Sequence, residues 1–136
     1  MRLPRPYGNM ELAADEVEEH TGLECGWHPE QRLGYHSTIV HSQEIWAWLV
    51  EQLEDCYDDL LEEWQQDIIS RAVIQRAIDE LSPQLSGRLA EWVRPWDERF
   101  RAATVVASRR YWDGGWWADR IPRQFGPRGY LFAAYS

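Results

Sequence analysis

Apolar residues at helical spacing dominate the middle of the chain. From Ser42, a typical N-cap, to about Gln66 they recur every three or four positions, which predicts an amphipathic helix. The stripe then continues toward Leu81 on a face rotated by about a quarter turn, which predicts a break near Gln65–Ser70 and a second helix after it. The first stripe consists of Trp46, Leu49, Leu53, Cys56, Tyr57, Leu60 and Trp64, and the second of Ile69, Val73, Ala77 and Leu81.

Two further helices are predicted in the C-terminal half. Ser82 followed by proline is a standard helix start, and the first of these helices spans Pro83–Val93. Pro95 is predicted to end it and to restart the chain, with the next helix running into Val106. The inward-facing residues are Leu85, Leu89 and Trp92 in the first helix, and Trp96, Phe100 and Ala103 in the second.

The pattern is weaker at the N-terminus. Residues 1–9 are predicted to form an extended arm, and Asn9 can cap a short helix over Met10–His20. Glycine and proline indicate a loop over Thr21–Gly34. The β-branched residues within Tyr35–His41 favour one short strand.

The C-terminal segment carries a turn signal between aromatic residues. Asp113-Gly114, within residues 109–117, predicts a β-hairpin, and the tail from Ile121 ends in apolar residues that we expect to dock on the core. We therefore predict a mainly α, compact single domain over residues 1–136. It is a bundle of four to five helices with a small C-terminal β-hairpin.

Charge is distributed unevenly along the chain. Residues 1–70 carry 16 acidic residues against three arginines, a net charge of −13, whereas residues 71–136 carry seven acidic residues against 11 arginines, a net charge of +4. The whole chain has a net charge of −9, which disfavours direct nucleic-acid binding through a broad basic footprint. All 14 basic residues are arginine, so P-loop, Schiff-base and lysine-nucleophile chemistry are excluded.

The helix pair predicted over residues 43–81 is strongly acidic on its polar side. Within it, Glu51, Asp55, Asp58 and Glu62 follow one another at spacings of four, three and four, which predicts one shared face. Two interpretations stay open: a solvated helix exterior, or a surface that docks on a basic protein. The predicted partner-binding residues are Glu51, Glu54, Asp55, Asp58, Asp59, Glu62 and Glu63.

A second candidate site is a zinc site. Cys25 and His28 have the two-residue gap of a zinc half-site, and His36 and His41 are separated by four residues. The alternative interpretation is a set of surface and packing histidines. Apart from zinc, no cofactor is expected.

Arginine and tryptophan interleave from Trp92 to the end of the chain, most densely in the hairpin and tail predicted over residues 109–136. Such residues can stack on single-stranded nucleic acid. Because the overall charge is negative, pairing with the acidic residues of the same chain, or of a second copy in a homodimer, is the preferred interpretation.

The sequence contains none of the common catalytic motifs, so we expect a non-enzymatic protein. The longest apolar run, Ile45–Val50, is too short to span a bilayer, and no signal sequence is evident, which favours a cytoplasmic protein. The expected function is an acidic inhibitor that covers a basic, nucleic-acid-binding surface of a partner protein, as anti-restriction, anti-CRISPR, immunity and antitoxin proteins do. The alternatives are a zinc-stabilised adaptor that uses the tryptophan-rich half as its interface, and a small enzyme.

Overall fold

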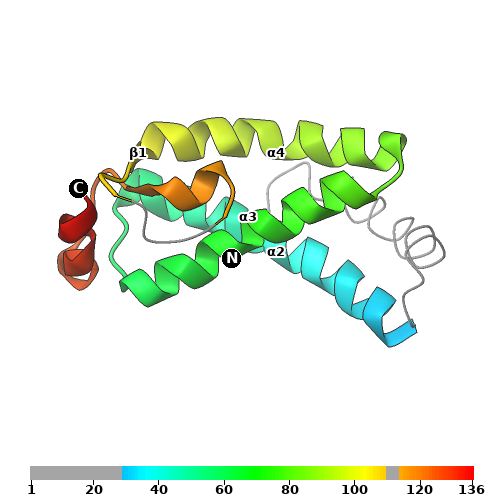
Figure 1. Cartoon of the computed structure of the whole chain (residues 1–136), viewed down its shortest axis with the longest axis horizontal. Coiled ribbons are helices and arrows are strands. Elements are labelled where there is room, and N and C mark those ends of the chain that lie inside the picture. The colour runs from blue at the N-terminus through cyan, green and yellow to red at the C-terminus, as the bar shows by residue number, and fades with distance from the viewer. Residues whose placement is uncertain (1–28, 110–113) are drawn as a thin grey trace.

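The computed structural model describes residues 29–109 and 114–136. Three long helices cross one another, and the C-terminal segments gather at one end of the molecule (Figure 1). The fold is mainly α with a small antiparallel strand pair, as predicted. In chain order the elements are α2 (Pro29–Asp55), α3 (Leu61–Glu80), α4 (Pro83–Ala103), β1 (Thr104–Val106), the 3₁₀ helix η1 (Trp116–Asp119), β2 (Arg120–Pro122) and the 3₁₀ helix η2 (Pro127–Tyr135).

Helix α2 begins much earlier than predicted. It runs from Pro29 through the end of the predicted Thr21–Gly34 loop and through the whole of Tyr35–His41, so the strand prediction is wrong. The lower helix propensity of β-branched residues costs less than about 1 kcal/mol each. Burial of Ile39, which is 1% exposed, outweighs that cost. The predicted arm over residues 1–9 and the helix over Met10–His20 lie outside the described residues.

The break between the two acidic helices lies before the predicted position. Helix α2 ends at Asp55, α3 begins at Leu61, and α3 continues without interruption through Ser70, so the break predicted near Gln65–Ser70 is wrong. The stripe that suggested it included Ile69, which is 43% exposed. The face of α3 that packs inward includes a buried arginine, Arg71, which concealed the true periodicity. The residues buried on α3 are Trp64, Ile68, Ser70, Arg71, Ile74 and Ala77.

Helix α4 is continuous, so the restart predicted at Pro95 is also wrong. The start at Ser82 and Pro83 is confirmed, and Pro95 lies inside a helix of 21 residues. A proline inside a helix costs about 3 kcal/mol. The helix continues because Trp96 and Phe100, both beyond Pro95, are buried at helical spacing, and each large apolar side chain contributes about 1.5–3 kcal/mol on burial.

The two paired strands lie farther apart in the sequence than the strands of a tight hairpin. β1 pairs antiparallel with β2 in the register Val105↔Ile121, and residues 107–119 connect the two strands. Of the predicted Asp113-Gly114 turn, Asp113 lies outside the described residues, while Gly114 is in a bend. Trp117 is 6% exposed, so the segment before β2 is anchored in the core.

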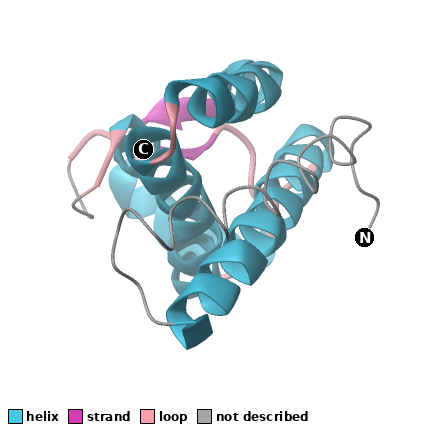
Figure 2. Ribbon diagram, turned by 90° about the vertical axis from the view of Figure 1, so that its right-hand side faces the viewer, coloured by secondary structure: helices cyan, strands magenta, loops and turns pink. Residues whose placement is uncertain are grey.

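The helices surround an aromatic core, and Figure 2 shows that they cross rather than run parallel. The ring of Trp64 lies 5.9 Å from that of Phe100, 5.3 Å from that of Tyr57 and 5.8 Å from that of Phe132. Trp46 in turn lies 4.5 Å from Phe100. Because Phe132 is fully buried, the prediction that the C-terminal tail docks on the core is confirmed.

One ion pair lies inside this core. Arg71 on α3 donates from Nε and Nη2 to the two carboxylate oxygens of Asp97 on α4, each at 2.9 Å. Trp46 on α2 donates from Nε1 to the same carboxylate at 3.1 Å. The Arg71 guanidinium also lies 5.0 Å from the ring of Trp117. The pair therefore joins all three helices to η1.

None of the helices in the described ranges 29–109 and 114–136 is both long enough and apolar enough to cross a membrane.

We expect Asp97→Asn to lower the free energy of unfolding by about 3 kcal/mol, because it leaves the buried Arg71 charge without a full counter-charge. Urea unfolding at neutral pH measures the loss. The control is Arg76→Gln, which breaks the exposed Arg76–Glu80 pair on α3 and should cost less than about 1 kcal/mol. Equal losses in the two variants would contradict this role for the Arg71–Asp97 pair.

Candidate functional site

The acidic residues predicted to bind a partner lie where α2 ends and α3 begins, and we call these seven residues the acidic corner. They do not share one helix face, because α2 ends at Asp55 and Asp58 lies in the link that follows it. The predicted single face of Glu51, Asp55, Asp58 and Glu62 is therefore wrong. The acidic corner consists of Glu51, Glu54 and Asp55 at the end of α2, Asp58 and Asp59 in the link, and Glu62 and Glu63 in the first turn of α3.

Glu54 joins the acidic corner to helix α4. Its carboxylate accepts hydrogen bonds from Nε of Arg99, at 2.8 Å, and from Nη2 of the same residue. The hydrogen bond from Arg99 lowers the pKa of Glu54 below its ordinary value, against the opposing effect of burial. The Arg99 guanidinium also lies 4.4 Å from the ring of Trp96, so this pair has a fixed place at the surface.

Asp58 and Asp59 join the acidic corner to the C-terminal tail. Asp58 accepts the backbone N–H of Arg128 at 2.9 Å, at the start of η2. Asp59 pairs with the Arg128 side chain at 3.3 Å and accepts the N–H of Leu60 at 2.8 Å. A Cβ atom at Gly126 would lie 2.5 Å from the carboxyl carbon of Asp58, so a larger residue there would displace the Asp58 side chain. Arginines of the C-terminal half therefore do pair with acidic residues of the same chain.

The other four carboxylates of the acidic corner point to solvent. Glu51, Asp55, Glu62 and Glu63 are all exposed, and none has a hydrogen-bonded or ion-paired partner in the described part of the chain. Leu60, in the link between them, is 37% exposed, and the thiol of Cys56 is free and exposed as well. The acidic corner thus presents four exposed carboxylates that form no ion pair in the described part of the chain, with an apolar side chain among them.

Behind the exposed carboxylates lies a partly buried acid. Tyr57 donates from its hydroxyl to Oδ2 of Asp67 at 3.1 Å. The pKa of Asp67 is raised to about 6, chiefly by burial; the hydrogen bond from Tyr57 lowers it, and the negative charges of Asp59 and Glu63 raise it. Burial and the nearby Asp67 charge also raise the pKa of Tyr57, so the tyrosine stays a hydrogen-bond donor at neutral pH.

Comparison of the chain with family models, with curated proteins and with solved structures found no match. Any function must therefore be argued from the site itself.

The structure describes only part of the predicted zinc site. Cys25 and His28 lie outside the described residues. His36 and His41 both fall within α2, where the His41 side chain is exposed. Residues 29–109 and 114–136 contain no group of three or more His, Cys, Asp or Glu placed to hold a metal ion. The zinc site remains a prediction.

The tryptophans of the C-terminal half divide between core and surface. Trp92, Trp96 and Trp117 are buried and serve packing. Trp116 is half-buried, and the Arg101 guanidinium stacks on its ring at 3.8 Å. Arg110 and Trp112 lie outside the described residues. Among the described residues, few tryptophan rings of this segment are therefore open for stacking on nucleic acid.

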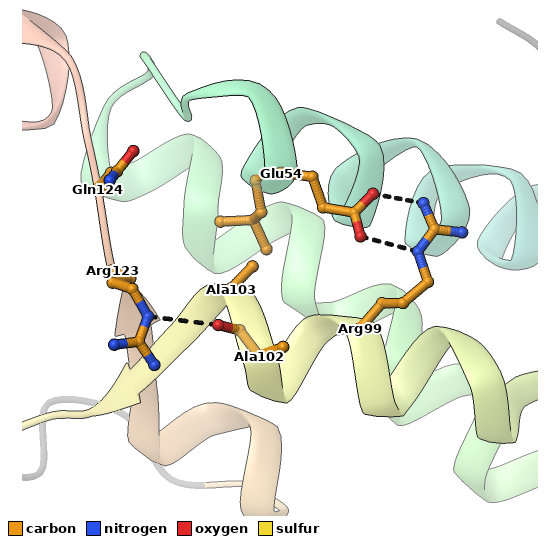
Figure 3. A pocket seen from close by; sticks show the side chains of 7 residues that line it. Glu54, Arg99, Ala102, Ala103, Arg123 and Gln124 are labelled. Atoms are coloured by element: carbon orange, nitrogen blue, oxygen red, sulfur yellow. Dashed lines mark hydrogen bonds and ion pairs between the residues drawn. The ribbon is translucent and has the colours of Figure 1, made fainter.

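Sequence reasoning missed a pocket beside the acidic corner. It has a volume of about 260 Å³ and lies between the ends of α2 and α4 and the residues after β2 (Figure 3). No motif marks it, since its residues come from three separate segments. The pocket is lined by Leu53, Glu54, Arg99, Ala102, Ala103, Arg123 and Gln124.

The raised pKa of Asp67 gives a prediction for stability. An acid whose folded-state pKa lies above its ordinary value of 3.8 binds its proton more tightly in the folded protein than in the unfolded chain. Asp67 should therefore contribute stability below about pH 4 that is lost as the pH rises to about 6. In Asp67→Asn this contribution is absent, so the stability of the variant relative to wild type should increase between these pH values and then level off.

NMR titration of the Asp67 carboxyl group checks the same point, with an expected midpoint of about 6. Tyr57→Phe should move the midpoint higher, because it removes the hydrogen bond that favours the ionised form. A midpoint at the ordinary value near 3.8 would show that the acid is not desolvated.

Zinc can be tested directly on the full chain. If Cys25, His28, His36 and His41 bind zinc, the purified protein should retain about one equivalent after dialysis, and a chelator should lower its melting temperature. Elemental analysis that finds no zinc would contradict the site, and Cys25→Ser is the matching variant.

Proposed function

We propose that this protein is a non-enzymatic inhibitor whose acidic corner docks on a basic surface of another protein, of the kind that binds nucleic acid. The observation that carries the proposal is the set of four exposed carboxylates, Glu51, Asp55, Glu62 and Glu63, left without partners in the described part of the chain. The net charge of −9 adds a long-range attraction that speeds encounter with a cationic partner.

The internal ion pairs of the acidic corner support this proposal by holding the surface in shape. Glu54 is fixed to Arg99 on α4, while Asp58 and Asp59 are fixed to Arg128 at the start of η2. The partner therefore would not need to order this segment, which lowers the entropy cost of binding. The exposed Leu60 supplies the apolar contact that charges alone lack.

The electrostatic cost of the acidic corner also favours a partner. Glu51 and Asp55 are four residues apart in the last turns of α2, where like charges repel by about 0.2–0.5 kcal/mol and the helix dipole disfavours negative charge. A basic surface would remove both penalties on binding. The free exposed thiol of Cys56 supports a cytoplasmic location, where thiols stay reduced.

The test separates the charges that would bind from those that hold the fold. Glu51→Gln, Asp55→Asn, Glu62→Gln and Glu63→Gln are combined in one variant. Its melting temperature should stay close to wild type, because the loss of two favourable charges at the start of α3 is offset by removal of two unfavourable ones at the end of α2. Affinity for the partner should fall, and its dependence on salt should weaken.

Proteins that bind immobilised wild-type protein at about 50 mM salt are identified by mass spectrometry and purified. The affinity of each for wild type and for each variant is then measured at about 50–300 mM salt. For a matched control, Glu62→Gln/Glu63→Gln is compared with Glu91→Gln/Glu98→Gln, which removes the same charge from exposed positions on α4. Binding that is lost only with the α3 pair supports the acidic corner. Captured proteins that bind the fourfold variant as tightly as wild type would refute the proposal.

A further inference from the structure

The pocket beside the acidic corner has a distinctive chemical make-up. Its floor is apolar, formed by Leu53, Ala102 and Ala103. On one side lies the Glu54–Arg99 pair, whose two charges are joined by two hydrogen bonds (Figure 3). Arg123 lies across the pocket from this pair. Because Glu54 and Arg99 neutralise each other, the lining residues together carry the single positive charge of Arg123.

Arg123 is oriented by the end of α4. Its backbone N–H donates to the carbonyl oxygen of Ala103 at 3.0 Å, and its Nε donates to that of Ala102 at 3.3 Å. Both of its terminal nitrogens remain available as donors, since Arg123 has no carboxylate partner in the described part of the chain.

Two further arginines add positive charge next to Arg123. Arg120 donates from Nη2 to the carbonyl oxygens of Arg101 and Thr104, at 3.1 and 3.2 Å. After burial, the charges of Arg101 and Arg123 lower the pKa of Arg120, so each of these two guanidinium groups is close enough to repel that of Arg120. The carbonyl oxygens of Arg101 and Ala102 that accept hydrogen bonds from Arg120 and Arg123 lie at the negative end of α4.

We propose that this pocket binds a small organic anion, with its carboxylate or phosphate held by the terminal nitrogens of Arg123 and its apolar part resting on Leu53, Ala102 and Ala103. The volume of about 260 Å³ lies just below the range of about 300–1,000 Å³ for drug-sized ligands, so the ligand is small. An anion held by Arg123 would offset the repulsion between Arg123 and Arg120, which adds to the preference of the site for negative charge.

The experiment is an NMR titration of the full chain at constant ionic strength with four probes: benzoate, phenyl phosphate, inorganic phosphate and benzyl alcohol. The first two carry both an anion and a ring, the third carries charge alone, and the fourth carries the ring alone. We expect saturable shifts of Ala102, Ala103 and Arg123 with benzoate or phenyl phosphate, and weaker binding of the other two probes. Which aromatic anion binds more tightly distinguishes a carboxylate from a phosphate ligand.

Three variants locate the binding. Arg123→Gln should weaken binding of the aromatic anions by about tenfold or more, the usual weight of a charge-assisted hydrogen bond. Arg94→Gln removes the same charge from an exposed position on α4 outside the pocket, and it should leave binding unchanged. Ala102→Leu fills the pocket while keeping every charge, and it should remove the advantage of the aromatic anions over inorganic phosphate.

Shifts that grow linearly with every probe would overturn the proposal, as would equal losses in Arg123→Gln and Arg94→Gln. An unchanged preference in Ala102→Leu would also overturn it, because the ring would then not rest in the pocket. These outcomes are independent of partner binding by the acidic corner, since none of the three variants alters its exposed carboxylates.

Discussion

The buried pair of Arg71 and Asp97 is the interaction on which the helix arrangement depends. Each charge would be costly in the core alone, so the pair favours the orientation of α3 and α4 that brings the two together. Trp46 adds a donor from α2, and the ring of Trp117 covers the guanidinium. Trp46 also joins the pair to the aromatic core, because its ring lies 4.5 Å from that of Phe100, which in turn stacks on Trp64 at 5.9 Å.

The same principle, applied at the surface, explains the acidic corner. A segment with this density of carboxylates is stable at a helix junction because some of them bind distant arginines. Glu54 reaches Arg99 on α4, and Asp59 reaches Arg128 in η2, so the negative segment holds the positive C-terminal half in place. Carboxylates beyond those needed for this task face solvent, which is why the molecule can combine a fixed shape with a strongly negative surface.

The opposite charge collects close by, at the end of α4. Arg120 and Arg123 donate to carbonyl groups at the end of α4, and in doing so they bring their charges close together, next to the pocket that Arg123 lines. The pocket depends on the acidic corner for one wall, through Glu54. Two surfaces of opposite sign are thus built from one set of contacts between the end of α2 and the end of α4.

Several features were predictable because they depend on residues close together in the chain. The mainly α fold follows from apolar residues at helical spacing, the start of α4 from Ser82 and Pro83, and the docking of the tail from its apolar composition. The density of acidic residues in the candidate site was likewise evident. Local signals misled at Pro95, where buried aromatic residues on both sides keep the helix intact.

Other features depend on residues far apart, and only the tertiary structure could decide them. Arg71 is 26 residues from Asp97, Glu54 is 45 from Arg99, and Asp58 is 70 from the Arg128 backbone that it binds. The break after Asp55 follows from such contacts, because Tyr57 turns inward to pair with Phe125 and accepts the N–H of Gly126 at 2.8 Å. The sequence by itself thus determined the helical class and the abundance of acidic groups. Which of those groups are neutralised, and which stay exposed, was decided by long-range pairing, since the energy of an ion pair depends on separation in space and not along the chain.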